Sequence, residues 1–200
     1  MKRIILSGGG TGGHIYPAVA VAEALKRRYG SDVEVLFFFF LGKMEMEKVP
    51  ALGYEIVGLP LLGIQRQFTW KNLTVPFRLI ASVLKARKVI RRFRPDVVVG
   101  FGGYVTGPVL RAAAKMGIKT AIHEQNAFPG VAVKLLSKRV DTILLGFEDA
   151  KKRLPKAKKV VLTGTPTKIK KVNLSKEQKN KMTKELGLSP DLPMVLVYGG

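Results

Sequence analysis

The chain has 200 residues, of which 35 are lysine or arginine, 14 are aspartate or glutamate, 2 are histidine and none is cysteine. The lack of cysteine excludes a disulfide scaffold, a thiolate nucleophile and cysteine-ligated metal sites, and the 46% of hydrophobic residues excludes global disorder. The formal net charge of +21 predicts an acidic partner, such as a nucleic acid, an anionic membrane or a phosphorylated substrate.

Short apolar segments alternate with helical segments along most of the chain. Strands are predicted at residues 4–6, 33–39, 54–59, 96–100, 119–123, 141–145 and 160–163. Helices are predicted at residues 17–29, 44–52, 75–93, 107–116 and 130–137, with Pro17 in a first helical turn and Gly30 as a C-terminal cap. Because buried strands that alternate with helices form parallel sheets covered on both faces, this order predicts a doubly wound, Rossmann-like α/β domain.

The character of the sequence changes after Gly164. Residues 165–174 are typical of a linker, residues 175–186 predict a helix capped by Ser175 and ended by Gly187, and residues 194–198 predict a buried strand. We therefore predict a first domain at 1–163 and, at 164–200, a linker with the first helix and strand of a truncated second domain. No signal peptide or membrane-spanning segment is predicted, which favours a cytoplasmic protein with at most peripheral membrane contact.

A glycine-rich segment, residues 7–14, joins the first predicted strand to the first predicted helix. Glycines let a backbone approach a ligand closely, and a helix N-terminus offers free N–H groups to an anion. The segment fits the dinucleotide pattern G-x-G-x-x-G, but the second predicted strand ends at Phe40-Leu41-Gly42-Lys43, without the acidic residue that a nicotinamide site wants there, which disfavours NAD. The alternative is a tight turn without a ligand, and the presence of Thr11 and His14 favours a ligand site over that turn.

Two further segments are predicted to end strands of the same sheet. One is a second glycine-rich segment, residues 100–108, and the other is the polar run His123-Glu124-Gln125-Asn126. Because the carboxyl ends of parallel strands meet at one edge, where open α/β sheets bind ligands, we expect these segments to lie close to residues 7–14. A structural role is the alternative for each histidine, and we favour a direct role for His14 over His123. With two histidines and few carboxylates, no metal site is expected.

A stretch without acidic residues, 56–95, contains the predicted helix 75–93. Its core-facing positions have helical spacing and are Val75, Leu79, Val83, Ala86, Ile90 and Phe93. A second stripe is typical of a membrane-surface patch, and this apolar–basic patch consists of Phe68, Trp70, Lys71, Leu73, Phe77, Arg78, Ile80 and Leu84. The alternative is that the stripe packs under a neighbouring loop. Nucleic-acid binding is disfavoured because no RNA-binding aromatic signature, zinc finger or helix-turn-helix is present.

Taken together, these motifs resemble the MurG family, the peptidoglycan glycosyltransferases that add N-acetylglucosamine to lipid I. The resemblance covers essentially the whole chain and rests on the segment 8–14 with Pro17, Met44-Glu45 before Val49-Pro50, the segment 102–108, residues 123–126 with Gly130, and Gly164-Thr165-Pro166. It implies a GT-B fold with two Rossmann-like domains, of which the first takes the lipid-linked acceptor and touches the membrane. The implied reaction is an inverting, metal-independent transfer from UDP-N-acetylglucosamine to the muramyl 4-hydroxyl of lipid I, at the cytoplasmic face of the cell membrane.

The resemblance also implies site residues. Catalytic roles are implied for His14 and Glu124, and which of the two is the base stays open. Contacts with the donor are implied for Thr11, Gly12, Gly13, Asn126 and Lys168. Contacts with the acceptor are implied for Gly102, Gly103, Tyr104, His123 and Gln125. No cofactor, metal or nucleic-acid partner is implied, and the isolated chain is expected to lack turnover; a non-catalytic module that captures diphosphate lipids, or a nucleic-acid-binding basic domain, is the alternative.

Three positions depart from the family pattern. Phe39-Phe40 replace a usual Gly-Thr, Val133 replaces an Asn, and Lys168 replaces an Arg. The phenylalanine run 37–40 is expected to lose the turn chemistry of that loop and to favour aggregation. Lys168 gives up the bidentate fork of arginine, which weakens recognition of phosphate.

Overall fold

The computed structural model describes residues 1–200 except 41–44, 60–74, 170–171 and 196–200. Contacts divide the chain into two compact units, Met1–Lys168 and Ile169–Gly200, which are described separately. The predicted boundary between residues 163 and 164 stays a prediction.

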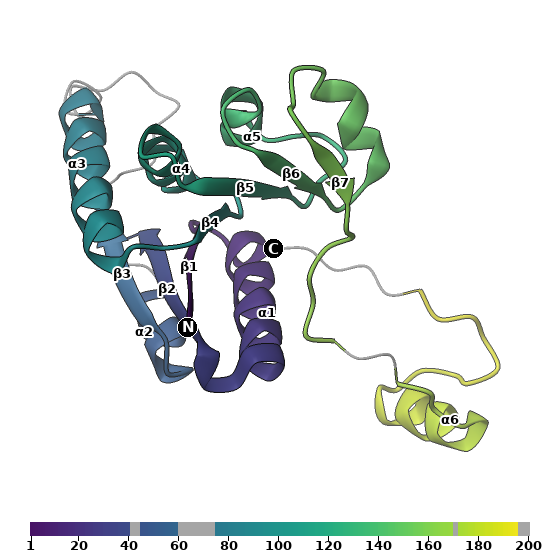
Figure 1. The fold of residues 1–200 in the computed structure, drawn as a ribbon. Coiled ribbons are helices and arrows are strands. Elements are labelled where there is room, and N and C mark those ends of the chain that lie inside the picture. The colour runs from purple at the N-terminus through teal and green to yellow at the C-terminus, as the bar shows by residue number, and fades with distance from the viewer. Residues whose placement is uncertain (41–44, 60–74, 170–171, 196–200) are drawn as a thin grey trace. The chain divides into compact units, whose positions relative to one another are not determined.

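The first unit is built on a parallel sheet (Figure 1). Its seven strands are β1 (Lys2–Ser7), β2 (Val33–Phe40), β3 (Glu55–Leu59), β4 (Val97–Gly100), β5 (Lys119–Glu124), β6 (Thr142–Leu145) and β7 (Val160–Leu162), in the order β3-β2-β1-β4-β5-β6-β7. The order reverses between β1 and β4, which pair in parallel with Ser7 opposite Gly100. Open sheets of this kind bind ligands at the carboxyl ends of the strands beside such a reversal. The predicted doubly wound Rossmann-like sheet is confirmed.

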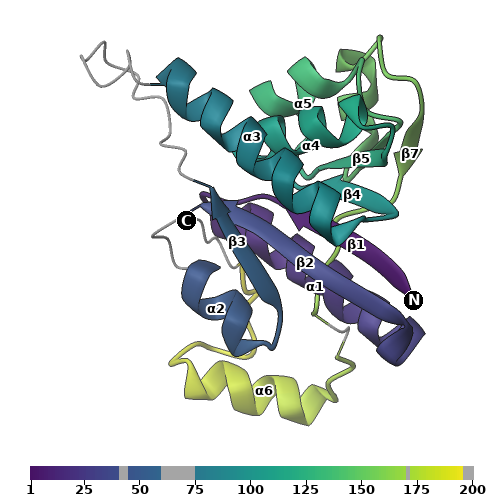
Figure 2. The same cartoon turned by 60° about the vertical axis from the view of Figure 1, so that its left-hand side comes forward.

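Helices cover both faces of the sheet. Figure 2 shows α3 (Val75–Phe93), α4 (Thr106–Lys115) and α5 (Val131–Leu136) on one face, and α1 (Gly12–Tyr29) and α2 (Glu45–Ala51) on the other. Alternate residues of each strand point to opposite faces, so Ile5 packs in the cluster with α3, α4 and α5, whereas Leu6 packs in the cluster with α1 and α2. Apolar side chains on both faces of the strands therefore form two hydrophobic cores, one on each side of the sheet.

The phenylalanine run forms the C-terminal half of β2 and does not form a loop. Phe37, Phe38 and Phe39 have no exposed surface, because β2 lies between β1 and β3 with helices on both faces. The rings of Phe37 and Phe39 stack at 5.6 Å, and Tyr54 meets Phe37 edge-on at 5.3 Å. In the folded chain these rings are thus withdrawn from intermolecular contact, and the aggregation expected of the run is confined to states in which β2 is exposed.

The predicted helix 75–93 is confirmed, and its C-terminal end lies at Phe93 as predicted. The first helix begins at Gly12, five residues before the predicted start, so the placement of Pro17 in a first turn was wrong. Pro17 has no N–H to donate to the carbonyl of Gly13. Its fixed φ still suits a helix, and it lies buried on the face of α1 that packs on the sheet. Two short 3₁₀ helices, Gly30–Asp32 and Glu148–Arg153, were not predicted.

The second unit contains α6 (Lys176–Glu185), which confirms the predicted helix. Ser175 caps it as predicted: the Gln178 amide donates to Ser175 Oγ at 3.2 Å, and the Ser175 amide donates to Gln178 Oε1 at 2.9 Å. Of the predicted strand 194–198, Met194 and Val195 are not in a strand, and the other residues lie outside the described part of the chain.

Among the helices that the structure describes, none combines the length and the apolar character needed to cross a membrane.

Candidate functional site

The two glycine-rich segments interlock at the carboxyl ends of β1 and β4. A Cβ atom placed on Gly103 would lie 2.3 Å from the carbonyl oxygen of Gly9, and one on Gly102 would lie 2.7 Å from His14 Nε2. Gly9, Gly102 and Gly103 all have positive φ, so both the contact and the backbone conformation require glycine. The predicted meeting of the two segments is therefore confirmed.

Hydrogen bonds of the Phe101 backbone and of the Thr106 hydroxyl fix the second segment on the sheet. The Phe101 amide donates to the Ser7 carbonyl at 2.7 Å, which continues the ladder between β1 and β4 by one residue. The Thr106 hydroxyl lies 2.7 Å from the carbonyl of Gly102 and 3.1 Å from that of Ser7. Gln125 Nε2 donates to the Phe101 carbonyl at 3.0 Å, so the polar run after β5 also supports this loop.

His14 lies in the first turn of α1, half-buried between the two loops. Its Nδ1 atom is 3.1 Å from the Gly9 carbonyl oxygen and 3.3 Å from Thr11 Oγ1. Thr11 is the N-cap residue in extended conformation, but its side chain makes no capping hydrogen bond. The N–H groups of His14 and Ile15 donate to the Thr11 carbonyl. Those of Gly12 and Gly13, which precede them, can receive an anion such as a diphosphate together with the adjacent loop.

Glu124 is 2% exposed, and three N–H groups occupy its carboxylate. Oε1 accepts from the backbone amide and the side-chain amide of Asn126, both at 2.9 Å, and Oε2 accepts from the Gly130 amide at 2.7 Å. Gly130 is the N-cap of α5, so this carboxylate fixes the turn 124–130 and the start of that helix. A carboxylate with both oxygens engaged is suited to holding a loop, and the predicted catalytic role of Glu124 stays a prediction.

His123 is 1% exposed and lies at the end of β5, with its ring 5.9 Å from that of Phe101. Its Nε2 donates to the Gly164 carbonyl at 3.0 Å, while its buried Nδ1 has no hydrogen-bond partner among the described residues. Burial lowers the pKa of His123 below its usual 6.5, against the opposing effects of the Gly164 carbonyl and the Glu124 carboxylate. The predicted contact of His123 with an acceptor stays a prediction, and its observed partner is the turn that leaves β7.

We expect the free energy of unfolding to fall in mild acid because of His123. The unfolded chain binds this proton near pH 6.5 and the folded chain only at lower pH. The stabilisation by neutral His123 is therefore complete above pH 6.5 and is lost, by up to about 1.4 kcal/mol per pH unit, as the pH falls toward the folded-state pKa. Urea unfolding as a function of pH measures it. His123→Gln, which can still donate to Gly164, should remove this component, and an unchanged pH slope in that variant would contradict the assignment.

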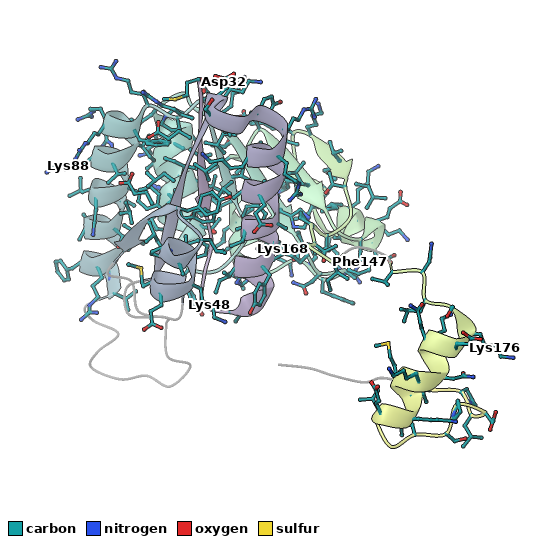
Figure 3. All side chains as sticks on the ribbon, turned by 90° about the horizontal axis from the view of Figure 1, so that it is seen from below. Asp32, Lys48, Lys88, Phe147, Lys168 and Lys176 are labelled. Carbon is teal, nitrogen blue, oxygen red and sulfur yellow. The ribbon has the colours of Figure 1, made fainter. Side chains whose placement is uncertain are left out.

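The remaining predicted site residues differ in their exposure and in their partners. Tyr104 is 54% exposed on the second loop, and Asn126 is exposed but tied to Glu124. Lys168 pairs with Glu23 on α1, about 16 Å along the helix from Gly12, and Figure 3 labels it beside that helix. In this chain Lys168 is thus not brought to the glycine loops.

Sequence reasoning missed the backbone carbonyl of Gly9 and the side chain of Thr106. Thr106 gave a weak signal, because a polar residue at the start of an otherwise apolar helix needs a partner when it is buried. The carbonyl of Gly9 gave none, since its role depends on the position of His14 in space.

The apolar residues of the patch that the structure describes are exposed on the N-terminal half of α3, whereas Arg78 is half-buried. Phe77, Ile80 and Leu84 are 75%, 58% and 58% exposed. Leu79 was predicted to face the core, and this prediction was wrong: its side chain is 44% exposed. The buried residues of α3 begin only at Ser82, one turn further along the helix. The patch residues Phe68, Trp70, Lys71 and Leu73 lie outside the described residues.

The fold and the site define a Rossmann-like α/β domain with the topology of a GT-B glycosyltransferase half. The family model for the glycosyltransferase family 28 N-terminal domain matches residues 4–145, and the chain belongs to this family. The resemblance to the MurG family is confirmed by the relatives described next.

Two relatives are similar along the whole chain. The UDP-N-acetylglucosamine–N-acetylmuramyl-(pentapeptide) pyrophosphoryl-undecaprenol N-acetylglucosamine transferase of Christiangramia forsetii is 48% identical over 99% of this chain and 53% of its own length. That of Cytophaga hutchinsonii is also 48% identical, over the same shares. The chain spans about half the length of the curated relatives it matches.

Solved structures agree on the fold. The crystal structure of Acinetobacter baumannii MurG has a TM-score of 0.68 and 30% identity, covering 84% of this chain and 47% of that one. UDP-GlcNAc 2-epimerase from Neisseria meningitidis, bound to UDP-GlcNAc, has a TM-score of 0.61 at 16% identity, over 82% of this chain and 46% of that one, which is a likeness of fold alone.

Proposed function

We propose that this chain is the acceptor-binding half of an inverting glycosyltransferase of peptidoglycan synthesis. The enzyme would transfer N-acetylglucosamine from UDP-N-acetylglucosamine to the muramyl 4-hydroxyl of lipid I. The observation that carries the proposal is 48% identity, along nearly the whole chain, to transferases with that activity in their names. The interlocked glycine loops, with a histidine between them, are consistent with it.

The residues of the site have separate roles in this proposal. The loop around Gly103 and the N-terminus of α1 hold the diphosphate of the lipid-linked acceptor through backbone N–H groups. His14 takes the proton of the acceptor hydroxyl, whose oxygen forms the bond to the anomeric carbon as the bond to UDP breaks with its electron pair. Glu124 holds the turn after β5.

The proposal is tested with the chain itself and with the full-length parent protein. The parent should transfer N-acetylglucosamine to a soluble lipid I analogue without added metal, and the 200-residue chain should not. The chain should nevertheless bind vesicles that contain lipid I more strongly than vesicles that lack it, at two salt concentrations. Equal binding to both vesicles, abolished by salt, would leave only a basic surface and would contradict an acceptor site.

We also propose that the chain associates peripherally with the cytoplasmic face of the cell membrane, through the apolar–basic patch. Three exposed apolar side chains on one stretch of α3, within a chain of net charge +21, support a surface that enters an anionic leaflet. We favour a membrane over a nucleic acid because nucleic-acid binding does not require the apolar stripe.

Replacing Phe77, Ile80 and Leu84 together by serine should weaken binding to anionic vesicles by about tenfold or more, since each apolar side chain withdrawn from water stabilises the bound state. Co-sedimentation with vesicles measures the loss. Val131 and Leu135, which are 75% and 70% exposed on α5, provide a matched control when both are replaced by serine. An equal loss in the control would show that the α3 stripe has no special role.

A further inference from the structure

The imidazole of His14 has a protonation pattern that its neighbours determine. A neutral imidazole carries one N–H, on either Nδ1 or Nε2. Nδ1 lies 3.1 Å from the carbonyl oxygen of Gly9, and a carbonyl oxygen can only accept. A hydrogen bond at this position therefore requires that Nδ1 carry the proton.

Thr11 is the one described neighbour that could favour the opposite pattern. Its hydroxyl lies 3.3 Å from Nδ1 and can either donate or accept. If it donated, Nδ1 would be bare and would face the bare oxygen of Gly9 at 3.1 Å, which is repulsive. If it accepts, both contacts are satisfied by the same N–H. The arrangement as a whole thus favours the Nδ1–H form.

The second glycine loop holds both the imidazole and its acceptor. A Cβ on Gly102 would lie 2.7 Å from Nε2 and 2.8 Å from Cδ2 of His14, so the ring has its place only because that position is glycine. Gly103 touches the carbonyl of Gly9 in the same way, which keeps this oxygen directed at Nδ1. None of the described residues donates a hydrogen bond to Nε2.

We propose that Gly9 and Gly102 are positioning residues that fix His14 as the Nδ1–H tautomer, with Nε2 bare and free to accept a proton. Gly9 does so by hydrogen bonding, and Gly102 by leaving room for the ring. The inference rests on the proposed function, in which His14 receives the proton of the acceptor hydroxyl. It specifies that Nε2 is the atom that accepts the proton, and that Nε2 is already unprotonated in the substrate-free protein.

The tautomers can be observed directly, because the chain has only two histidines. In a long-range ¹H–¹⁵N spectrum of the labelled chain, at about pH 8 where neutral imidazoles predominate, His14 should show a protonated Nδ1 and a bare Nε2. His123, which donates from Nε2 to Gly164, should show the opposite pattern and serves as the internal reference. A protonated Nε2 on His14 would overturn the proposal.

Variants separate the positioning residues from the general stability of the loop. Gly102→Ala should displace the ring, so that His14 loses the pure Nδ1–H pattern. Gly107→Ala, where a Cβ meets nothing within 4 Å, should keep it. Thr11→Val should also keep it, whereas a change to Nε2–H in that variant would assign the control to Thr11 and overturn the role of Gly9. If Gly102→Ala does not fold, the wild-type and Thr11→Val spectra still decide between these outcomes.

The positioning and the function can fail separately. The tautomer is read without donor or acceptor, so the wrong pattern would overturn the positioning proposal and leave the transferase function intact. In the full-length parent, Gly102→Ala should lower kcat by about tenfold or more and shift the acid limb of its pH profile. A parent that transfers no sugar, with His14 in the Nδ1–H form, would overturn the function and leave the positioning intact.

Discussion

Gly103→Ala is expected to destabilise the chain by about 3 kcal/mol or more, the largest loss for any single methyl group at this site. Two costs add. Gly103 has φ +81°, where an L-residue is strained, and its new Cβ would lie 2.3 Å from a backbone oxygen of Gly9. Because that oxygen belongs to the main chain, it cannot rotate away as a flexible side chain would. The two loops must part, and His14 then loses its hydrogen-bond acceptor.

Two other glycines separate these costs. Gly117 has a similar φ of +73° with nothing within 4 Å of its Cβ position, so Gly117→Ala should show only the conformational strain, about 1–2 kcal/mol. Gly107 has neither feature and lies in α4, so Gly107→Ala should be neutral or slightly stabilising. Urea unfolding of the three variants measures the differences. If Gly103→Ala cost no more than Gly117→Ala, the interlocking of the two loops would contribute nothing to stability.

Sequence analysis predicted best the elements that are defined by residues adjacent in the sequence. The helix Val75–Phe93 was predicted with its C-terminal end, because a long stretch with helical spacing ends at Arg94 and Pro95. The start of α1 was missed because Gly12 and Gly13 have low helical propensity and their sequence is typical of a loop. Ile15 packs against residues of β1 and β2, and this packing stabilises the first turn as helix. A contact between residues so distant in sequence cannot be predicted from a local pattern.

The candidate site shows the same division. Polar and glycine-rich segments at strand ends predicted where the site lies, since all parallel strands bring their carboxyl ends to one edge. They did not predict what each side chain does there. Glu124 and His123 are adjacent in sequence, yet one holds the turn 124–130 and the other binds the carbonyl of Gly164. Which backbone groups lie within reach depends on the path of loops that are distant in sequence.

The place of Phe39 shows how the core and the site are connected. Its ring lies under the first glycine loop, where a Cβ on Gly8 would be 3.5 Å from Phe39 Cε1 and 3.5 Å from His14 Cβ. This chain therefore supports the loop with an aromatic ring from the end of β2. The backbone of the first glycine loop is thus held by the ring of Phe39 at Gly8 and by Gly103 at the carbonyl of Gly9.

Glu124→Gln is expected to destabilise the chain by about 2–4 kcal/mol although it only replaces one carboxylate oxygen by an NH₂ group. The carboxylate accepts three N–H bonds, and an amide has only one oxygen with which to accept them. If that oxygen stays on Asn126, the new NH₂ group faces the Gly130 amide, and two donors meet at the 2.7 Å distance that now separates a donor from an acceptor. The start of α5 should loosen, which faster hydrogen exchange at Gly130 would reveal.

Asn126→Ala is the matched comparison, because it removes one of the three hydrogen bonds and leaves the carboxylate charge in place. It should cost only about 1 kcal/mol and leave exchange at Gly130 unchanged. The full-length parent then separates the two candidates for the base. If Glu124 only holds the turn, Glu124→Gln should lower activity while the acid limb of the pH profile persists. If that limb disappears in Glu124→Gln, the carboxylate is the group that accepts the proton, and the assignment to His14 is wrong.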